Sequence, residues 1–385
     1  MVPLARELTR AVGGDAARHV HLGATSQDIM DTAAMLVSRR AGAVIRADAD
    51  IVCAALAALS GEHRATIMAG RTLLQQALPT TFGAVAAGWL NGVGTAAQAL
   101  DEVIEHRTAA QLGGAAGTLA SLEGRGPAVA AAFADELGLA EPVLPWHTDR
   151  GPIVELAGAL ARVCGATGKI AGDIALLAQT EVGEATEEGG AGVGGSSTLP
   201  HKRNTIAAVS ALGCAEQAPG LASTLFAAQV QQHQRAAGPW HAEWLPLSRL
   251  LGVTGSAVAW LRTSLERLAV HPERMRANLD LTDGFPLAER VTTDLAGELG
   301  RLPAHELVQS ACQEAADSGR ALAEVLTERL QGRRTGSEIA SLLDPAGYLG
   351  ATGAFVDRAL AAHAERTARR GTGPAGDPAR NRSRT

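Results

Sequence analysis

The chain has 385 residues, enough for a large hydrophobic core and, by length alone, for roughly two or three domains. Hydrophobic residues make up 46% of it and aromatic residues only 3%, a composition that favours long packed helices over sheets. The net charge is −6 and the body of the chain holds no large basic block, which argues against nucleic acid as a partner.

No run of about 18 or more apolar residues free of charge occurs, so no membrane span is predicted. The N-terminus lacks the charged region and apolar core of a signal peptide. The four cysteines stand far apart, with neither metal-ligand spacing nor a disulfide framework: Cys53, Cys164, Cys214 and Cys312. We therefore expect them to be small core residues of a cytoplasmic protein that needs no metal.

Long helix-forming segments follow one another along the chain. A helix is expected almost directly after Met1, and longer ones over residues 31–57, 80–107, 151–187, 205–234 and 244–268. After Pro272 the pattern shortens to helices such as 303–318 and 321–331. Helices this long need long partners, which predicts an all-α fold built as a bundle.

These patterns predict four parts. Residues 1–30 form an N-terminal region with a first motif, and residues 31–270 form the central long-helix bundle with a glycine- and serine-rich loop at 189–204. Residues 271–369 form a small C-terminal helical domain. Residues 370–385, rich in Gly, Pro, Arg and Ser, are expected to be a disordered tail.

The most informative segment is that loop, which reads G-G-S-S-T-L-P-H-K-R-N from Gly194 to Asn204 and follows the glycines at 189, 190 and 192. Flexible glycines, paired hydroxyls, a lysine and an amide before a helix are typical of a loop that closes over an anion. The alternative is an ordinary surface connector. The order of the residues favours function, because it resembles the signature loop G-S-S-x-M-P-x-K-x-N-P of the fumarase/aspartase superfamily, with Leu199 and Thr205 as departures.

A second segment reads H-L-G-A-T-S-Q-D from His21 to Asp28 and resembles the superfamily's first region, H-x-G-x-T-S-x-D. Hydroxyls of Thr25 and Ser26 near a helix start are placed to donate to a substrate carboxylate. Ordinary helix capping is the alternative interpretation. Beside the serine loop, we favour substrate binding.

A third segment, from Gly70 to Pro79, resembles the region that usually reads R-T-H-x-Q in lyases of this superfamily. Leu73 stands at the position of its histidine. In those lyases the histidine pairs with a glutamate five residues after the loop asparagine, a position that is Val209 here. Both members of the dyad are therefore apolar in this chain.

This double loss indicates the kind of reaction. An amine or hydroxide leaving group benefits from a general acid, but a carboxylate does not, since its conjugate acid has a pKa of about 4. A chain without the dyad suits a reaction in which a carboxylate leaves or, in reverse, adds internally to a double bond. Lactone formation from a muconate is such a reaction.

Three further runs resemble the 3-carboxy-cis,cis-muconate cycloisomerases of the superfamily. They are residues 145–150 (P-W-H-T-D-R), residues 111–118 and residues 235–244. The resemblance implies a homotetramer with active sites shared between subunits, a small tricarboxylate substrate, and no metal or organic cofactor, because the substrate supplies its own nucleophile. The implied product is 4-carboxymuconolactone, in protocatechuate breakdown by the β-ketoadipate pathway.

The resemblance also implies residue roles. Ser196 would transfer the proton at the carbon α to a carboxylate, with its pKa lowered by N–H donors and cations of the closed loop. The substrate-binding residues would be His21, Thr25, Ser26, Gln75, His147, Lys202, Asn204 and Arg235. Four of these, His21, Gln75, His147 and Arg235, have the alternative of being hydrogen-bonded interior residues. Arg71, His201 and Arg203 either contact substrate, face solvent or brace the loop.

Two alternatives stay open. An adenylosuccinate-type lyase shares most motifs, but Leu73 and Val209 argue against it and no phosphate site is recognisable. The second is an inactive subunit, because superfamily members normally carry a further helical domain ahead of His21. A misplaced start codon or a truncation would explain that difference.

Overall fold

The computed structural model describes residues 2–189 and 194–371. Gly190 and Gly192 of the serine loop, and residues 372–385 of the expected tail, lie outside the described residues. Within that tail, residues 370 and 371 are still the end of a helix.

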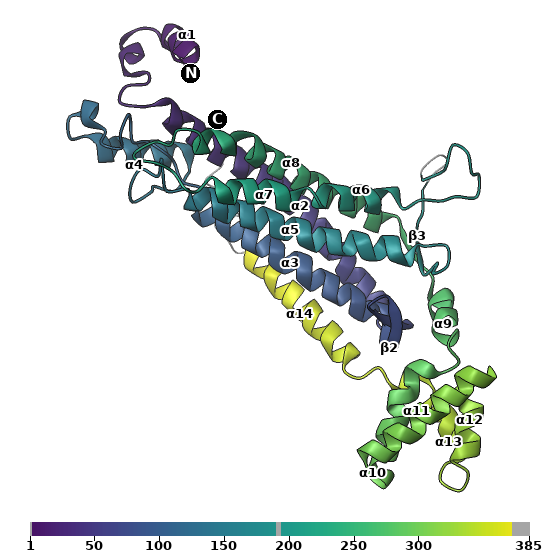
Figure 1. The fold of residues 1–385 in the computed structure, drawn as a ribbon. Helices are drawn as coiled ribbons and strands as arrows, with labels where there is room; N and C mark the ends of the chain where they lie inside the picture. The colour runs from purple at the N-terminus through teal and green to yellow at the C-terminus, as the bar shows by residue number, and fades with distance from the viewer. Residues whose placement is uncertain (1, 190–193, 372–385) are drawn as a thin grey trace. The chain divides into compact units, whose positions relative to one another are not determined.

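The first half of the described chain runs through the following elements (Figure 1): α1 Val2–Val12, η1 Asp15–His19, α2 Ser26–Glu62, β1 Ile67–Thr72, β2 Gln75–Thr81, α3 Phe82–His106, η2 Ala120–Leu122, α4 Gly126–Leu137, α5 Gly151–Leu177 and β3 Ala185–Glu187. The second half continues with α6 Ile206–Ala215, α7 Ala218–Ala227, α8 Pro239–Glu266, β4 Leu268–Val270, α9 Pro272–Asp280, η3 Phe285–Leu287, α10 Ala288–Leu299, α11 Arg301–Ser318, α12 Leu322–Arg329, α13 Gly336–Leu342, η4 Pro345–Gly347 and α14 Thr352–Gly371.

The all-α class is confirmed. Apart from isolated bridges, strands in the described residues are limited to two small antiparallel pairs, β1 with β2 and β3 with β4. None of the helices in the described ranges is long and apolar enough to cross a membrane.

Two predicted helices are shorter than expected. The helix predicted over 151–187 ends at Leu177, because the chain turns there: Gly183 has φ +61°, and residues 185–187 then pair with β4. The helix predicted over 205–234 is divided into α6 and α7, with Pro219 in the first turn of α7. A proline there supplies no N–H to an uninterrupted helix, which explains the break.

The chain forms two compact units. Unit 1 comprises residues 1–52, 93–172 and 206–264, and unit 2 comprises residues 53–92, 173–205 and 265–385. The predicted boundaries at 30, 270 and 369 stay predictions.

Unit 1 is built on closely packed segments of α2, α3, α5 and α8. Gly42 of α2 lies against Ile104 of α3, where a Cβ would stand 2.9 Å from the isoleucine Cδ1. The thiol of Cys164 donates to Thr254 Oγ1 over 3.2 Å, which joins α5 to α8. Small residues at such contacts let long helices approach, and fully buried aliphatic side chains fill the space between them: Met35, Ile45, Leu100, Ile153, Leu156, Leu160, Ile170 and Leu225.

Unit 2 contains the β1–β2 hairpin, which packs against α9, and a helical cluster of α10 to α13 (Figure 1). The cluster has its own apolar core, formed by Val291, Leu295, Ala304, Val308, Ala311, Ala315, Leu322, Val325, Leu326, Leu330 and Ile339. Arg334 Nε donates to Asp294 Oδ2 over 2.9 Å on its surface.

Candidate active site

The residues predicted to form the site fall into two sets, one in each unit. Unit 1 holds His21, Thr25, Ser26, His147 and Arg235, and unit 2 holds Gln75, Ser196, Lys202 and Asn204. Each set has its own local geometry.

In unit 2, the serine loop is closed at its base by Asn204. Its backbone N–H and its side-chain Nδ2 both donate to the carbonyl oxygen of Gly194, over 2.8 and 3.0 Å. Gly194 has φ +72°, and a Cβ there would stand 2.5 Å from the Asn204 oxygen, so only glycine fits. Asn204 thus holds the loop in shape, while its predicted contact with a substrate carboxylate stays a prediction.

Ser196 lies half-buried inside this loop, and its Oγ accepts two hydrogen bonds. The donors are the backbone N–H groups of Thr198, at 3.2 Å, and Leu199, at 3.1 Å. Donors aimed at a hydroxyl oxygen stabilise the alkoxide form and make the hydroxyl a better acid. Lys202, one of the two lysines in the whole chain, is exposed on the same loop, as are His201 and Arg203.

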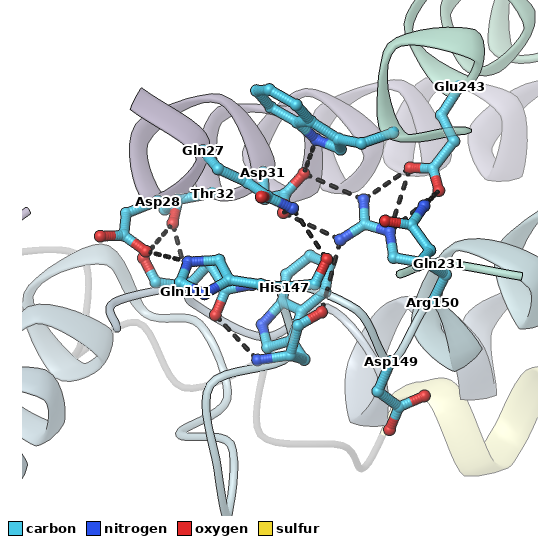
Figure 2. A network of polar contacts seen from close by, with 12 residues as sticks. Gln27, Asp28, Asp31, Thr32, Gln111, His147, Asp149, Arg150, Gln231 and Glu243 are labelled. Carbon is cyan, nitrogen blue, oxygen red and sulfur yellow. Dashed lines mark hydrogen bonds and ion pairs between the residues drawn. The ribbon is translucent and has the colours of Figure 1, made fainter. Parts of the chain in front are cut away.

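In unit 1, the first motif is organised around the buried carboxylate of Asp28 (Figure 2). Its Oδ2 accepts from the backbone N–H groups of Thr25 and Gly114, both at 2.9 Å. Its Oδ1 accepts from Gly113 N–H at 3.0 Å and lies 2.6 Å from His147 Nε2. One carboxylate therefore fixes the start of α2, the loop at 111–118 and the histidine of the cycloisomerase-like run at 145–150.

His147 and Arg235 are both held by neighbours inside unit 1. His147 is 3% exposed, which agrees with the interior alternative for this residue. Arg235 is half-buried, and its Nε donates to Gln27 Oε1 over 3.2 Å while Nη2 donates to the carbonyls of Gly114 and Ala115. Their roles toward a substrate stay predictions.

Next to the contacts of Asp28 lies a buried ion-pair network that the sequence analysis did not predict (Figure 2). Arg150 donates to both oxygens of Asp31, over 2.9 and 3.0 Å, and to Glu243 Oε2 over 2.6 Å. Trp240 Nε1 and Gln27 Nε2 also donate to Asp31. All three charged side chains are almost fully buried.

Two carboxylates share one guanidinium here, and this affects their protonation. Burial, the largest cause, raises the pKa of the Glu243 carboxyl above its ordinary 4.5; the hydrogen bond and charge of Arg150 oppose this, and Asp31 adds to it. The net direction is upward because a buried charge is poorly solvated and Arg150 is divided between two anions.

This raised pKa predicts a pH dependence of stability. Between pH 4.5 and the raised pKa, the folded chain holds a proton that the unfolded chain has released. The contribution of Glu243 protonation to the free energy of unfolding is therefore complete below pH 4.5. It is lost as pH rises through the raised pKa of Glu243. We expect the free energy of unfolding of the wild type, relative to Glu243→Gln, to fall over that window in urea titrations. A difference that stays constant with pH would contradict the assignment.

His21 and Ser26 border a concave surface of unit 1. They line a cavity of about 530 Å³ together with Val2, Ala5, Arg6, Thr9, Arg10 and Val20. Ser26 is the first residue of α2, so the helix dipole favours an anion there, and Arg6 of α1 adds positive charge, whereas Arg10 is paired with Glu7. Arg6 and Arg10 were missed by the sequence analysis, because they belong to none of its motifs.

The third motif lies on the β1–β2 hairpin of unit 2, which the sequence analysis did not predict. Leu73 and Leu74 form its two-residue turn and are 97% and 73% exposed. Val209, the second apolar replacement, is 52% exposed on α6. Gln75 is exposed directly after the turn, and Arg71 binds the buried Glu184.

Comparison with known families defines the class of protein. Residues 4–220 match the family described as "Lyase", and residues 284–359 match "Adenylosuccinate lyase C-terminus". The chain belongs to this lyase family, the fumarase/aspartase superfamily that its motifs resemble.

Individual relatives narrow the comparison. The chain is 48% identical over 364 residues to a 3-carboxy-cis,cis-muconate cycloisomerase of Bradyrhizobium diazoefficiens, covering 93% of this chain and 81% of that protein. It is 46% identical over 373 residues to a nitrosuccinate lyase of Streptomyces davaonensis, covering 94% and 78%. The crystal structure of the 3-carboxy-cis,cis-muconate lactonizing enzyme from Pseudomonas putida matches with a TM-score of 0.87 and 42% identity, over 95% of this chain and 82% of that one.

Proposed function

We propose that this chain is an enzyme that converts 3-carboxy-cis,cis-muconate to 4-carboxymuconolactone, a step in protocatechuate breakdown. The observation that carries the proposal is the apolar pair Leu73 and Val209 in a chain of this family. These two residues stand where an adenylosuccinate-type lyase would have its histidine and glutamate. The cycloisomerases among the relatives also support the proposal.

The reaction is an internal addition, and no group leaves. A substrate carboxylate oxygen forms a C–O bond to one carbon of a double bond, and the electron pair of that bond moves to the neighbouring carbon. That carbon lies α to another carboxylate, which stabilises the charge as an aci-carboxylate. Protonation of the carbon completes the lactone, so the enzyme must supply one proton and hold the carboxylates.

In this proposal, Ser196 supplies the proton. When its hydroxyl protonates the α carbon, its oxygen becomes negatively charged. The N–H groups of Thr198 and Leu199, at 3.2 and 3.1 Å from this oxygen, support the role because they stabilise that charge. Lys202, on the same loop, would bind the stabilising carboxylate, with Asn204 beside it.

Further carboxylate contacts would come from the other predicted residues. Thr25 and Ser26 stand at the start of a long helix, whose dipole favours anions. His21 would contribute from the cavity that it shares with Ser26. The remaining contacts would come from Gln75, His147 and Arg235.

A second candidate is the elimination of nitrite from nitrosuccinate. It is favoured by one observation, the 46% identity to the nitrosuccinate lyase of Streptomyces davaonensis, which is close to that of the cycloisomerases. Nitrite, like a carboxylate, is a stable anion that leaves without protonation, so the missing dyad fits this reaction too. In this elimination, Ser196 would remove the proton from the carbon α to a carboxylate as the C–N bond of the neighbouring carbon breaks.

A paired assay separates the two reactions. Loss of the conjugated-diene absorbance follows the muconate, and colorimetric nitrite release follows nitrosuccinate, with the same enzyme preparation in both. We expect kcat/KM for the muconate to exceed that for nitrosuccinate by at least about 100-fold, or about 2.7 kcal/mol of transition-state binding. The reverse ratio would establish the second candidate, and turnover of neither substrate would contradict both.

We further propose that the enzyme is a cytoplasmic homotetramer. Support comes from a stripe of exposed residues on α2 within unit 1. Its members follow one another at alternating intervals of four and three positions: Ala33, Val37, Arg40, Val44, Ala47 and Ile51. Val37, Val44 and Ile51 are 54%, 64% and 40% exposed. A repeat of about 3.5 residues is the pattern that another long helix matches, so a second copy of this chain is the expected occupant.

Val44→Asp is expected to weaken this assembly, because it buries an unpaired charge in an apolar seam. Size-exclusion chromatography with light scattering should show a shift from tetramer to smaller species. Val129→Asp, at a 40% exposed valine of α4, is the control and should leave the mass unchanged. An unchanged tetramer in Val44→Asp would contradict the role of the stripe.

A further inference from the structure

The turn of the β1–β2 hairpin has an unusual sequence for its geometry. Thr72 pairs with Gln75, so only Leu73 and Leu74 connect the strands. Both have positive φ, 51° and 64°, the left-handed region that such a turn requires at both positions. Asn-Gly is the favoured pair there, and leucine adopts this conformation only under strain. The turn therefore depends on contacts outside itself.

Those contacts come from the flanking residue on β1. Arg71 donates from Nη1 to Glu184 Oε2 over 2.9 Å and from Nη2 to Glu184 Oε1 over 2.5 Å. The Glu184 side chain is fully buried, whereas that of Arg71 is 24% exposed. A paired, planar ion pair of this kind fixes direction as well as distance.

The opposite strand is held in the same way. Asn278 of α9 donates from Nδ2 to Glu184 Oε1 over 2.8 Å, and its carbonyl accepts from Gln76 Nε2, also at 2.8 Å. Arg71 and Gln76 are direct partners in the hairpin register. We call Arg71, Gln76, Glu184 and Asn278 the hairpin clamp.

The clamp decides which side chains the hairpin presents outward. Side chains alternate between the two faces of a strand, so anchoring Arg71 and Gln76 on one face places Thr72 and Gln75 on the other. Both of these are exposed. A slip of one residue would turn Gln75 inward, and the Leu-Leu turn offers little resistance to such a slip.

Glu184 also joins the hairpin to the stem of the serine loop. Its N–H donates to the carbonyl of Leu177 over 2.9 Å, and its carbonyl accepts from His271 N–H over 3.0 Å. These bonds fix the chain one residue before β3, and the segment leading to Ser196 follows β3. The Glu184 carboxylate thus holds the hairpin, while the Glu184 backbone is fixed in the segment that leads to the serine loop.

We propose that Glu184 is a positioning residue that, through the hairpin clamp, holds Gln75 in the orientation needed for substrate binding. The proposal rests on the proposed function, since Gln75 acts there as a substrate contact. Glu184 itself touches no substrate in this account. It acts by fixing the hairpin register against a turn sequence that does not fix it.

The first test is Glu184→Gln, which keeps the side-chain shape but removes the charge that pairs with Arg71. We expect KM for the substrate that the wild type turns over to rise about tenfold or more, with kcat changed less than about threefold. Arg71→Lys, which replaces the paired contact by a single one, should give a smaller change in the same direction. It also serves if Glu184→Gln fails to fold.

Rescue distinguishes positioning from general destabilisation. Leu73→Asn with Leu74→Gly gives the turn its favoured sequence, so the register no longer depends on the clamp. The variant with all three changes should therefore have a KM within about threefold of the KM of the Leu73→Asn, Leu74→Gly variant that keeps Glu184. Asp294→Asn, which breaks the exposed pair with Arg334, is the control and should leave KM unchanged.

Two outcomes would overturn the proposal. One is a Glu184→Gln enzyme with lowered thermal stability but unchanged KM, which is a purely structural effect. The other is a raised KM that the Asn-Gly turn does not restore. A wild-type chain that turns over neither the muconate nor nitrosuccinate contradicts the proposed function instead, and the inference about Gln75 is withdrawn with it.

Discussion

Replacing Ser196 with alanine is expected to lower kcat for 3-carboxy-cis,cis-muconate by on the order of 10³-fold, the usual effect of losing a positioned proton donor. Within the described part of this loop, the Oγ of Ser196 accepts two backbone N–H bonds, from Thr198 and Leu199. Without the oxygen, these N–H groups have no developing charge to stabilise. KM should change little, because the carboxylate contacts remain.

Ser197→Ala is the matched comparison, since it removes a hydroxyl one residue away. It should keep kcat within about tenfold of the wild type. Both variants should have the oligomeric mass of the wild type in light scattering. A Ser196→Ala enzyme with a near-normal rate, or a larger loss in Ser197→Ala, would show that the proton comes from another group.

The second large effect concerns stability. Arg150→Met is expected to lower the free energy of unfolding by about 3–5 kcal/mol, because it leaves two buried carboxylates without their cation. The side chains of Asp31 and Glu243 are 4% and 3% exposed, so water cannot replace the guanidinium. Urea denaturation at fixed protein concentration measures the loss.

Removing the charges as well provides the control. Adding Asp31→Asn and Glu243→Gln to Arg150→Met should recover most of the lost stability, because the cost comes from unpaired charge rather than from volume. A loss of less than about 1 kcal/mol in Arg150→Met would contradict the buried network.

Part of this structure could be predicted from the sequence alone. Long apolar periodicity gives the helical class, and the ordered loop from Gly194 to Asn204 locates Ser196. Helix ends were less predictable. A single glycine, Gly183, and a single proline, Pro219, divide segments whose composition is helical on both sides.

The hairpin could not be predicted because its local signal points the other way. Leu73 and Leu74 are poor turn residues, and the turn forms because Glu184 and Asn278, distant in sequence, hold its flanks. Local propensity carries no information about such contacts. The hairpin that carries the third motif is therefore explained by contacts with residues distant in sequence and not by its own turn sequence.

The buried network was also missed, although a sequence signal existed. Asp28 and Asp31 are three residues apart on one helix, so they share a face, and both stand among residues that become buried. What the sequence does not reveal is their partners. His147, Arg150 and Glu243 lie more than a hundred residues away along the chain.

The most direct test of the central claim is an NMR analysis of the product formed from 3-carboxy-cis,cis-muconate in D₂O. The proposed reaction predicts 4-carboxymuconolactone with one deuterium at the carbon α to a carboxylate, because the exchanged hydroxyl of Ser196 delivers a deuteron there. Unchanged muconate after prolonged incubation with folded enzyme, or a product without the new C–O bond, would contradict the account.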